Sequence, residues 1–407
     1  MMLLSQKKSI STVVSTILPL LLLASCSASL EDDIEADEEW SVNASAASNS
    51  SIAPRSIPFV SGKGYPYYRT PAIVKAADGT LLAFAGARDE KADDSEGDIV
   101  LRRSADRGFR WEAQQVIAGR SSTDRFAIPI PVVLDSGKII LLYNGSGYVE
   151  REEDRGCRSV FMKTSTDNGK TWSSRRDITS QVQMPCKEDN KGRVADPVPA
   201  GHWGWTGLGP SHGIVKQQAP NKGRILVCAR RADNNGMRSY VIYSDDHGSS
   251  WSFGNAINQK SSECALVELP NGNVMLNARR GGETFRVVAV SANGGKSFGP
   301  AWLEDQLPEP SSGCEASMLR HGDSVLFSNP NSKTDKTRGT LRRSTDGGMT
   351  WTRSRQYNKS GDFSGYTDLV RVNNGVGVLV EWGPSLDGKD THKEIRFIVV
   401  PNQDLGL

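Results

Sequence analysis

The sequence has few of the residues that bind transition metals and almost no net charge. Its 407 residues include five histidines, which are scattered, and six cysteines without a Cys-x-x-Cys pair, which disfavours a metal site. Basic and acidic residues number 49 and 47 and form no basic stripe, so a nucleic acid is not an expected partner. Long segments of helical periodicity are also missing, and short apolar runs between turn residues predict strands instead. We expect neither a metal nor a cofactor.

The first residues, 1–25, predict a lipoprotein-type signal peptide. Two early lysines precede the apolar stretch 13–23, which is too short to span a bilayer comfortably. The stretch ends in Leu-Ala-Ser-Cys26, which resembles a bacterial lipobox, so Cys26 is the expected lipidation site. We expect export and anchoring at the outer membrane or cell surface. A periplasmic or secreted protein with an ordinary signal peptide is the alternative.

Residues 26–54 are first acidic and then rich in Asn, Ala and Ser, with almost nothing to bury. This composition predicts a flexible tether. Residues 55–407 show no second change of composition, so we expect them to form one domain.

Five short segments of that domain share the pattern Ser-x-Asp-x-Gly-x-x-Trp. They begin at Ser104, Ser165, Ser244, Ser291 and Ser344, and the fourth has Asn and Phe in place of Asp and Trp. In each, Asp or Asn can bond its own backbone, Gly accepts positive φ, and the aromatic ring packs beneath a tight hairpin. Spacings of roughly 50 to 80 residues fit four-stranded units. The repeat predicts an all-β, six-bladed β-propeller, closed by pairing of the strand-like runs 57–60 and 395–400.

The cysteines after Cys26 are odd in number, so at least one should be free. Cys228 and Cys264 lie in apolar strand-like runs, and we interpret them as buried small side chains. Cys157 and Cys186 lie in a loop-rich insert, residues 148–205, where a disulfide is conceivable.

Three arginines stand at the ends of strand-like runs. Arg69 precedes one, Arg279 ends another, and Arg338 precedes the strand that leads to the last repeat. Strand ends of all blades meet at the axis of a propeller, and a guanidinium binds a carboxylate through two charge-assisted hydrogen bonds. Any one of these residues alone could be a surface arginine, but together they favour an axial site for a carboxylate.

The chain resembles the bacterial exo-α-sialidases (neuraminidases) of the Asp-box, or BNR-repeat, family from about residue 65 to 398. Besides the boxes, the resemblance rests on Tyr68-Arg69-Thr70-Pro71, on residues 207–213, on Ser262-Glu263-Cys264, on Asn277-Ala278-Arg279, on Phe327 to Pro330 and on Gly365 to Leu369. It implies that Arg69, Arg279 and Arg338 grip the carboxylate of sialic acid. It also implies that Tyr366 is the nucleophile and Glu263 its base. Thr70 and Ser262 depart from the residues usual in the family, which bears on substrate fit more than on the reaction.

The resemblance also implies an acid/base aspartate in the loop after Arg88. Asp94 fits best by distance along the chain, and Asp93 is the alternative. We interpret Asp89 and Asp98 as solvated loop charges. Arg88 itself resembles an auxiliary site arginine.

Glu381 resembles the family's carboxylate that orients the first arginine. Trp203 and Trp205, at the end of the insert, could stack on a sugar or serve as packing residues.

A tyrosine nucleophile suits this substrate because an Asp or Glu would be repelled by the sugar's own carboxylate; sialidases with a Tyr nucleophile are a recognised exception to two-carboxylate glycosidases. The resemblance implies retaining hydrolysis of terminal α-linked sialic acids. The expected partners are sialylated glycans, glycoproteins and gangliosides, with membrane contact through Cys26 and a monomeric state. The alternatives are a trans-sialidase, including an intramolecular one, and a non-catalytic sialic acid-binding propeller.

Overall fold

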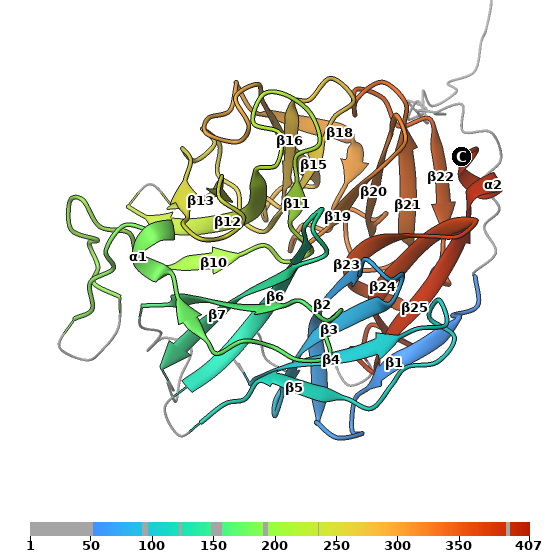
Figure 1. The fold of residues 1–407 in the computed structure, drawn as a ribbon. Coiled ribbons are helices and arrows are strands. Elements are labelled where there is room, and N and C mark those ends of the chain that lie inside the picture. The colour runs from blue at the N-terminus through green and yellow to red at the C-terminus, as the bar shows by residue number, and fades with distance from the viewer. Residues whose placement is uncertain are drawn as a thin grey trace, which may run out of the picture. The chain divides into compact units, whose positions relative to one another are not determined.

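The computed structural model describes residues 52–91, 97–121, 124–147, 157–189, 194–234, 236–387 and 391–407. Within these ranges the chain forms six antiparallel sheets arrayed around one axis (Figure 1). Five sheets have four strands and one has five. The predicted all-β, six-bladed propeller is therefore confirmed.

The first three blades use the N-terminal half of the domain. Blade 1 contains β2 (Tyr67–Lys75), β3 (Leu81–Arg88), β4 (Asp98–Ser104) and β5 (Gln115–Ala118). Blade 2 contains β6 (Asp124–Val133), β7 (Ile139–Gly147), β8 (Ser159–Ser165) and β9 (Arg176–Asp177), followed by helix α1 (Thr179–Val182). Blade 3 contains β10 (Thr206–Leu208), β11 (Ile214–Val215), β12 (Ile225–Asp233), β13 (Gly236–Ser244) and β14 (Ser252–Phe253).

The last three blades follow in chain order. Blade 4 contains β15 (Cys264–Glu268), β16 (Val274–Ala278), β17 (Phe285–Ser291) and β18 (Trp302–Pro308). Blade 5 contains β19 (Ser317–His321), β20 (Ser324–Pro330), β21 (Gly339–Ser344) and β22 (Arg353–Gln356). Blade 6 contains β23 (Phe363–Val372), β24 (Gly375–Gly383), β25 (Glu394–Pro401) and β1 (Ser56–Val60), and helix α2 (Asn402–Leu405) follows β25.

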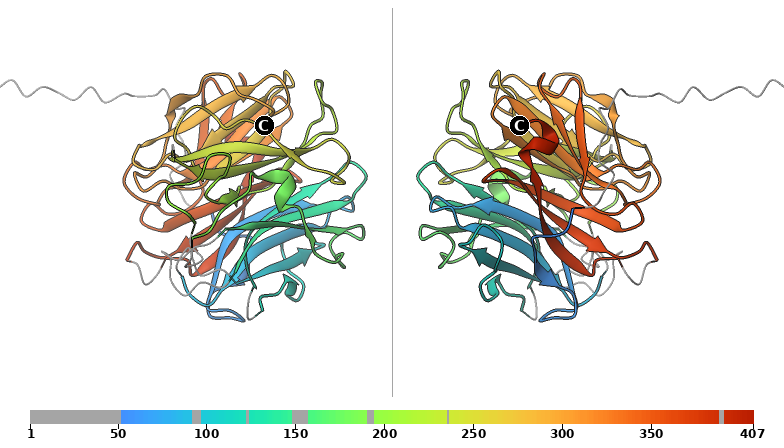
Figure 2. Two further views of the ribbon diagram at one scale, coloured as in Figure 1. Left: turned by 90° about the vertical axis from the view of Figure 1, so that its left-hand side faces the viewer. Right: turned by 90° about the vertical axis from the view of Figure 1, so that its right-hand side faces the viewer.

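Strand β1 closes the ring, as predicted. It pairs antiparallel with β25, with Phe59 opposite Ile395 and Val60 opposite Glu394. The side views in Figure 2 show the red C-terminal blade beside the blue strands of the first blade, and β23 contacts β2. The strand nearest the N-terminus of the domain therefore completes the last blade and holds the first and last blades together.

Each Asp box connects the last two strands of its blade in chain order. In the Ser244 box, Asp246 Oδ1 accepts hydrogen bonds from the Ser244 hydroxyl at 2.8 Å and from the Ser250 N–H at 2.8 Å. Gly248 has φ +86°, and a Cβ there would lie 2.5 Å from Ile140 of the preceding blade. Glycine is therefore required both by the backbone conformation and by the close contact between blades. These contacts confirm the turn chemistry that the repeat predicts.

The hydrophobic core lies between blades. In the part of the chain that the structure describes, buried side chains form six clusters, and the largest of these joins blades 2 and 3. The first strands of neighbouring blades surround the axis, with β2 beside both β6 and β23, and β19 beside both β15 and β23. Since packing between the blades supplies the apolar burial, the ends of the first strands can bear polar residues.

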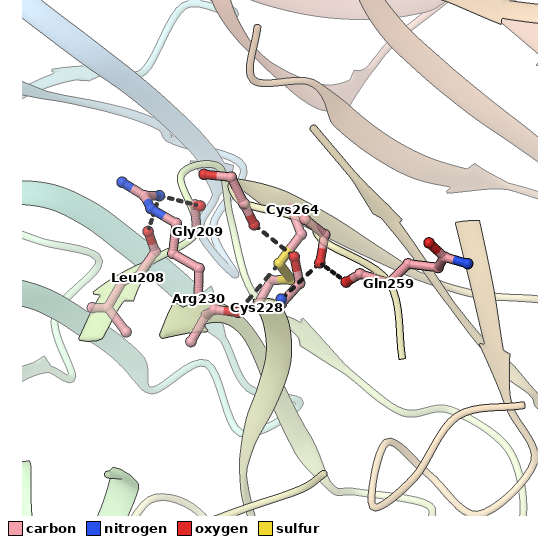
Figure 3. Close-up of a disulfide and its surroundings, with 10 residues drawn as sticks. Leu208, Gly209, Cys228, Arg230, Gln259 and Cys264 are labelled. Atoms are coloured by element: carbon pink, nitrogen blue, oxygen red, sulfur yellow. Dashed lines mark hydrogen bonds between the residues drawn. A yellow bond between two sulfur atoms is a disulfide. The ribbon is translucent and has the colours of Figure 1, made fainter. Parts of the chain in front are cut away.

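Two disulfides cross-link the domain. One joins Cys157 and Cys186 within the insert, where a disulfide was conceivable. The other joins Cys228 of β12 to Cys264 of β15 (Figure 3). Our interpretation of these two as separate buried side chains is wrong, because propeller closure brings strands of blades 3 and 4 side by side with a Cα–Cα distance of 5.8 Å. Cys314 is free and buried, which confirms that at least one cysteine is unpaired.

The predicted signal peptide, Cys26 and most of the predicted tether lie outside the described residues. In the ranges that the structure does describe, no helix is long and apolar enough to cross a membrane. The same ranges contain no group of three or more His, Cys, Asp or Glu residues that could hold a metal ion.

Candidate active site

Polar side chains from several blades meet in a cavity of about 500 Å³ at one mouth of the propeller. The lining residues on which the argument depends are Thr70, Arg88, Arg230, Glu263, Arg279 and Tyr366. Tyr366 lies in β23, Glu263 directly precedes β15, and Arg279 directly follows β16. The structure thus brings together residues from blades 1, 3, 4 and 6.

The first strands of three blades bulge at this mouth. The register shifts between Arg69 and Ala72 in β2, between Ala127 and Ile130 in β6, and between Ser364 and Thr367 in β23. Thr70 and Ile128, both of which line the cavity, have φ values of +51° and +58°. Positive φ is costly for β-branched residues, and strained backbone and bulges gather at functional sites. The bulges redirect side chains toward the cavity.

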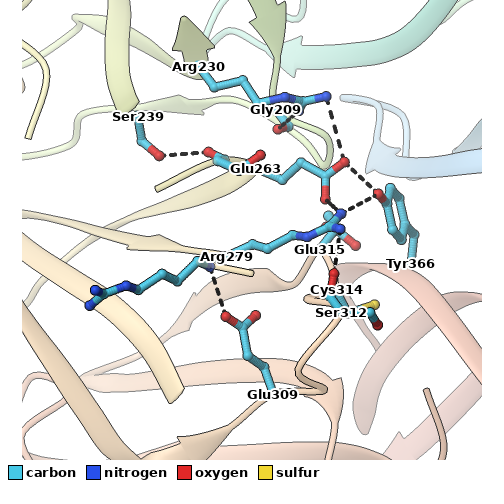
Figure 4. A network of polar contacts seen from close by, with 12 residues as sticks. Gly209, Arg230, Ser239, Glu263, Arg279, Glu309, Ser312, Cys314, Glu315 and Tyr366 are labelled. Carbon is cyan, nitrogen blue, oxygen red and sulfur yellow. Dashed lines mark hydrogen bonds and ion pairs between the residues drawn. The ribbon is translucent and has the colours of Figure 1, made fainter. Parts of the chain in front are cut away.

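The hydroxyl of Tyr366 donates a hydrogen bond to Oε1 of Glu263 at 2.5 Å (Figure 4). Nη1 of Arg279 donates to Oε2 of the same carboxylate at 2.7 Å and to the Tyr366 hydroxyl at 3.1 Å. Tyr366 and Glu263 are both buried. A buried phenol with a carboxylate in direct contact is the arrangement that activates a hydroxyl nucleophile.

The charge state of Glu263 is set by its two arginine neighbours. Burial by itself raises the pKa of Glu263, but Arg279 and then Arg230 lower it, and the net pKa is below the usual value. Nη2 of Arg230 lies 3.7 Å from Oε1 of Glu263. The carboxylate is therefore ionised and able to accept a proton at neutral pH.

Glu381 holds Arg69 beside Tyr366. Nε of Arg69 donates to Oε1 of Glu381 at 3.0 Å, and the backbone N–H groups of Thr70 and Tyr366 donate to the same carboxylate at 2.8 and 3.2 Å. Burial raises the pKa of Glu381, but Arg69 and His392 lower it by more, so the net pKa is well below normal. Arg69 also lies over the Tyr366 ring, 5.8 Å from its centroid.

Of the remaining predicted site residues, Arg88 lines the cavity and Arg338 does not. Arg88 is buried and lines the cavity. The Arg338 side chain is exposed and does not belong to the described residues that line it. Asp93 and Asp94 lie outside the described residues, so their role stays a prediction.

Asp98 is not a solvated loop charge, and that interpretation is wrong. It begins β4, is buried, and accepts hydrogen bonds from the Tyr65 hydroxyl and from the Arg120 N–H. Its partners come from segments distant in sequence, so the acidic loop composition could not reveal them. Asp89 is exposed and pairs with Arg120, as expected for a solvated charge.

The sequence left open whether the two tryptophans of the insert serve in packing or in stacking on a sugar, and the structure places them differently. Trp203 is buried and packs against Tyr240 and Phe253, with ring centroids 5.1 and 5.0 Å apart. Trp205 lines the cavity, with Arg158 4.9 Å from its ring centroid. Trp203 is therefore a packing residue, and Trp205 is available to contact a ligand.

Sequence reasoning missed two charged residues near the Tyr366–Glu263 pair. Arg230 lies mid-strand in β12, without a motif to mark it. Glu315 is buried, and its Oε2 accepts a hydrogen bond from the Thr367 N–H at 2.8 Å. Burial raises the pKa of Glu315 well above normal. Its position directly after Cys314, within a segment rich in small residues, was the available signal.

The fold is a six-bladed propeller, and the cavity at its mouth is lined by several arginines. A family model described as "BNR repeat-like domain" matches residues 79–379. The chain therefore belongs to this family.

Relatives and solved structures agree with that assignment. The chain is 32% identical over 350 residues to a sialidase of Micromonospora viridifaciens and 31% identical over 270 residues to one of Paraclostridium sordellii. These alignments cover 80% and 62% of this chain but only 51% and 63% of the two relatives. The predicted resemblance to bacterial sialidases with BNR repeats is confirmed.

Structural similarity extends over most of the chain. A Hadza microbial sialidase superposes with a TM-score of 0.70 at 24% identity, covering 84% of this chain and 67% of that one. A leech intramolecular trans-sialidase also gives a TM-score of 0.70, at 15% identity, covering 86% and 70%. At these identities the similarity establishes the propeller fold alone.

Proposed function

We propose that the protein is an exo-α-sialidase, a glycoside hydrolase that removes terminal α-linked sialic acids from glycoconjugates. The main support is the buried hydrogen bond of 2.5 Å between the Tyr366 hydroxyl and Glu263. The family relationship and the arginines around this pair support the same reaction. Sialylated glycans, glycoproteins and gangliosides are the proposed substrates.

In the proposed reaction, Glu263 accepts the phenolic proton as the Tyr366 oxygen attacks the anomeric carbon. A carboxyl group from the loop after Arg88, Asp94 or alternatively Asp93, protonates the departing glycosidic oxygen. The same aspartate then deprotonates the water that cleaves the sialyl-tyrosine bond, and Glu263 returns its proton to the departing Tyr366 oxygen. Two displacements at one carbon give net retention of configuration.

Arg69, Arg279 and Arg338 would bind the carboxylate of the sugar. Arg69 is held in place by Glu381, and Nη1 of Arg279 lies at hydrogen-bond distance from the nucleophile, so a carboxylate bound there would lie next to the attacking oxygen. Positioning of this kind supplies much of the rate enhancement of enzymes. Arg88 would contact the substrate near the acid.

Export and lipidation at Cys26 are part of the proposal and depend on residues 1–54. The wild-type chain should partition with membranes, and the Cys26→Ala variant should be released. Recovery of both in the same soluble fraction would contradict anchoring.

The proposed activity is tested by proton NMR of the first product formed from an α-sialyllactose, with Tyr366→Phe alongside. Immediate release of α-sialic acid by the wild type, lost in the variant, is the expected result. Initial release of the β-anomer would contradict retention, and an anhydro sugar would indicate intramolecular transfer. Binding of sialic acid without turnover would indicate a binding propeller.

A further inference from the structure

The Cys228–Cys264 disulfide lies directly beside the proposed catalytic base. Cys264 is the residue after Glu263, at the start of β15, and Cys228 lies two positions before Arg230 in β12. The cross-link therefore joins the backbone of Glu263 in blade 4 to the strand that bears its second arginine in blade 3. Both cysteines are buried.

The carbonyl of Gly209 connects the same elements through hydrogen bonds. Its oxygen accepts from Nη1 of Arg230 at 3.1 Å and from the Cys264 N–H at 3.4 Å. The Gly209 N–H donates to the Cys228 carbonyl at 2.8 Å. Figure 3 shows Gly209 and Arg230 near the disulfide, and Figure 4 shows Gly209 and Arg230 near Glu263.

Nη1 of Arg230 is held by hydrogen bonds, while Nη2 faces the carboxylate of Glu263. Nη1 also donates to the Leu208 carbonyl at 3.2 Å, and the guanidinium lies 5.7 Å from the Trp205 ring centroid. Nη2 lies 3.7 Å from the Glu263 carboxylate. Arg279 reaches this carboxylate from within blade 4, so Arg230 is the arginine that holds it from blade 3.

We propose that the Cys228–Cys264 disulfide and Arg230 act as one positioning unit for Glu263, holding blades 3 and 4 at the spacing at which its carboxylate meets the Tyr366 hydroxyl. The inference rests on the proposed function, in which Glu263 is the base. Neither the disulfide nor Arg230 takes part in bond making, and both act through Glu263. A displacement of about 1 Å in such a group can cost about a hundredfold in rate.

Arg230 also bears on the ionisation of the base. The titratable groups that face Glu263 are Arg230, Arg279, Tyr366, Cys314 and Glu315. Removing Arg230 takes away one of the two cations, so the pKa of Glu263 should rise. The acid limb of the pH–rate profile should then move to higher pH.

The test is a double-mutant cycle on the full chain, with a fluorogenic α-sialoside as substrate. The four proteins are the wild type, Cys228→Ala/Cys264→Ala, Arg230→Met and their combination. Each change alone should lower kcat about tenfold and leave KM within about threefold, because the base is displaced while the carboxylate site is intact. If the two act as one unit, the combination should lose much less than the product of the single losses.

The second disulfide is a matched control within the same chain. Cys157→Ala/Cys186→Ala removes a cross-link that adjoins neither Glu263 nor Arg230 but lies near Arg158 and Trp205 of the cavity lining, so it should lower the melting temperature and leave the acid limb of the pH–rate profile unchanged. If the Cys228→Ala/Cys264→Ala protein does not fold, the proposal is tested with Arg230→Met in the disulfide-intact protein. A lower kcat and an acid limb moved to higher pH would then support it.

The proposal is overturned if Cys228→Ala/Cys264→Ala loses thermal stability but keeps the wild-type kcat and pH profile. It is also overturned if the combined variant loses as much kcat as the product of the two separate losses, or if Arg230→Met changes neither kcat nor the acid limb. A wild type that releases no sialic acid would refute the proposed function itself. An active wild type with unaffected variants would refute only the positioning unit.

Discussion

The Asp-box turns between the outer strands of the blades, here called the rim, and the mouth at the propeller axis use carboxylates in different ways. Asp246 of the Ser244 box is exposed and bonds Ser244 and Ser250 within its own turn. At the mouth, Glu381 is buried and bonds Arg69 across 312 residues, and Glu263 bonds Tyr366 across 103. A turn that completes its own hydrogen bonds can be repeated in many blades, whereas the mouth needs several blades at once. The repeats therefore build the fold, and residues outside them form the site.

Loss of Glu263, the proposed base, should produce the largest effect and separate the mouth from the rim most clearly. Glu263→Gln keeps the shape of the side chain but cannot accept the Tyr366 proton, so kcat should fall by about 100-fold to 10,000-fold. Steady-state kinetics with a fluorogenic α-sialoside measure this. Near-normal turnover would remove Glu263 from the proposed mechanism.

Glu381→Gln should destabilise the fold by about 3 to 5 kcal/mol at neutral pH, because it leaves a buried arginine without its carboxylate. The folded-state pKa of Glu381 is below its usual value of about 4.5, so the stabilisation by its carboxylate is complete above about pH 4.5 and is lost as the pH falls through the folded-state pKa. The difference in melting temperature between variant and wild type should therefore shrink as the pH is lowered below about 4.5.

A rim ion pair is the control for this measurement. Glu112 pairs with Arg103 at 2.7 Å, but its side chain is 46% exposed. Glu112→Gln should cost at most about 1 kcal/mol. Equal costs for the two variants would contradict the distinction between rim and mouth.

Arg338→Ala tests whether an exposed residue outside the cavity lining nevertheless binds substrate. Loss of one charge-assisted contact of about 1.5 to 3 kcal/mol should raise KM roughly 10-fold to 150-fold, with a smaller change in kcat. The neighbouring exposed Lys333→Ala is the control. An unchanged KM for Arg338→Ala would exclude it from the proposed carboxylate site.

Glu315→Gln should stabilise the protein at neutral pH by a smaller amount. Burial raises the pKa of Glu315, so the folded state holds a proton that the unfolded state releases above about pH 4.5, and stability falls as the pH rises from there. The melting-temperature advantage of the variant should grow between pH 4 and pH 8. A gain that is independent of pH would contradict this reason.

Asp246→Ala should have the smallest effect. It removes one turn's hydrogen bonds at an exposed site, so the melting temperature should fall by only a few degrees, about 1 kcal/mol, and kcat should not change. Gly248→Ala in the same box should cost more, because its Cβ would meet Ile140 at φ +86°. A loss of activity in Asp246→Ala would mean that the rim and the mouth are coupled.

Much of the fold follows from local patterns. The boxes predict the propeller because each turn depends on residues within a short segment, and the alternation of apolar runs predicts the strands. The motifs around Arg69, Glu263, Arg279 and Tyr366 mark residues that the structure does bring together at one mouth.

The errors share one physical cause. Cys228–Cys264, the Arg230–Glu263 pair and the burial of Asp98 all depend on contacts between segments far apart in sequence. Nothing in the residues next to Arg230 distinguishes it from an ordinary strand arginine. The raised pKa of Glu315 likewise depends on burial that no local pattern records.

The sequence by itself determined the repeated turns, the all-β class of the domain and the family of the chain. Each of these can be recognised in short segments, and the turns complete their hydrogen bonds within such segments. Only the tertiary structure decided which residues surround the Tyr366–Glu263 pair and which carboxylates are ionised. Ring closure brings distant strand ends to one buried mouth, and both the distances and the desolvation there arise from all the blades together.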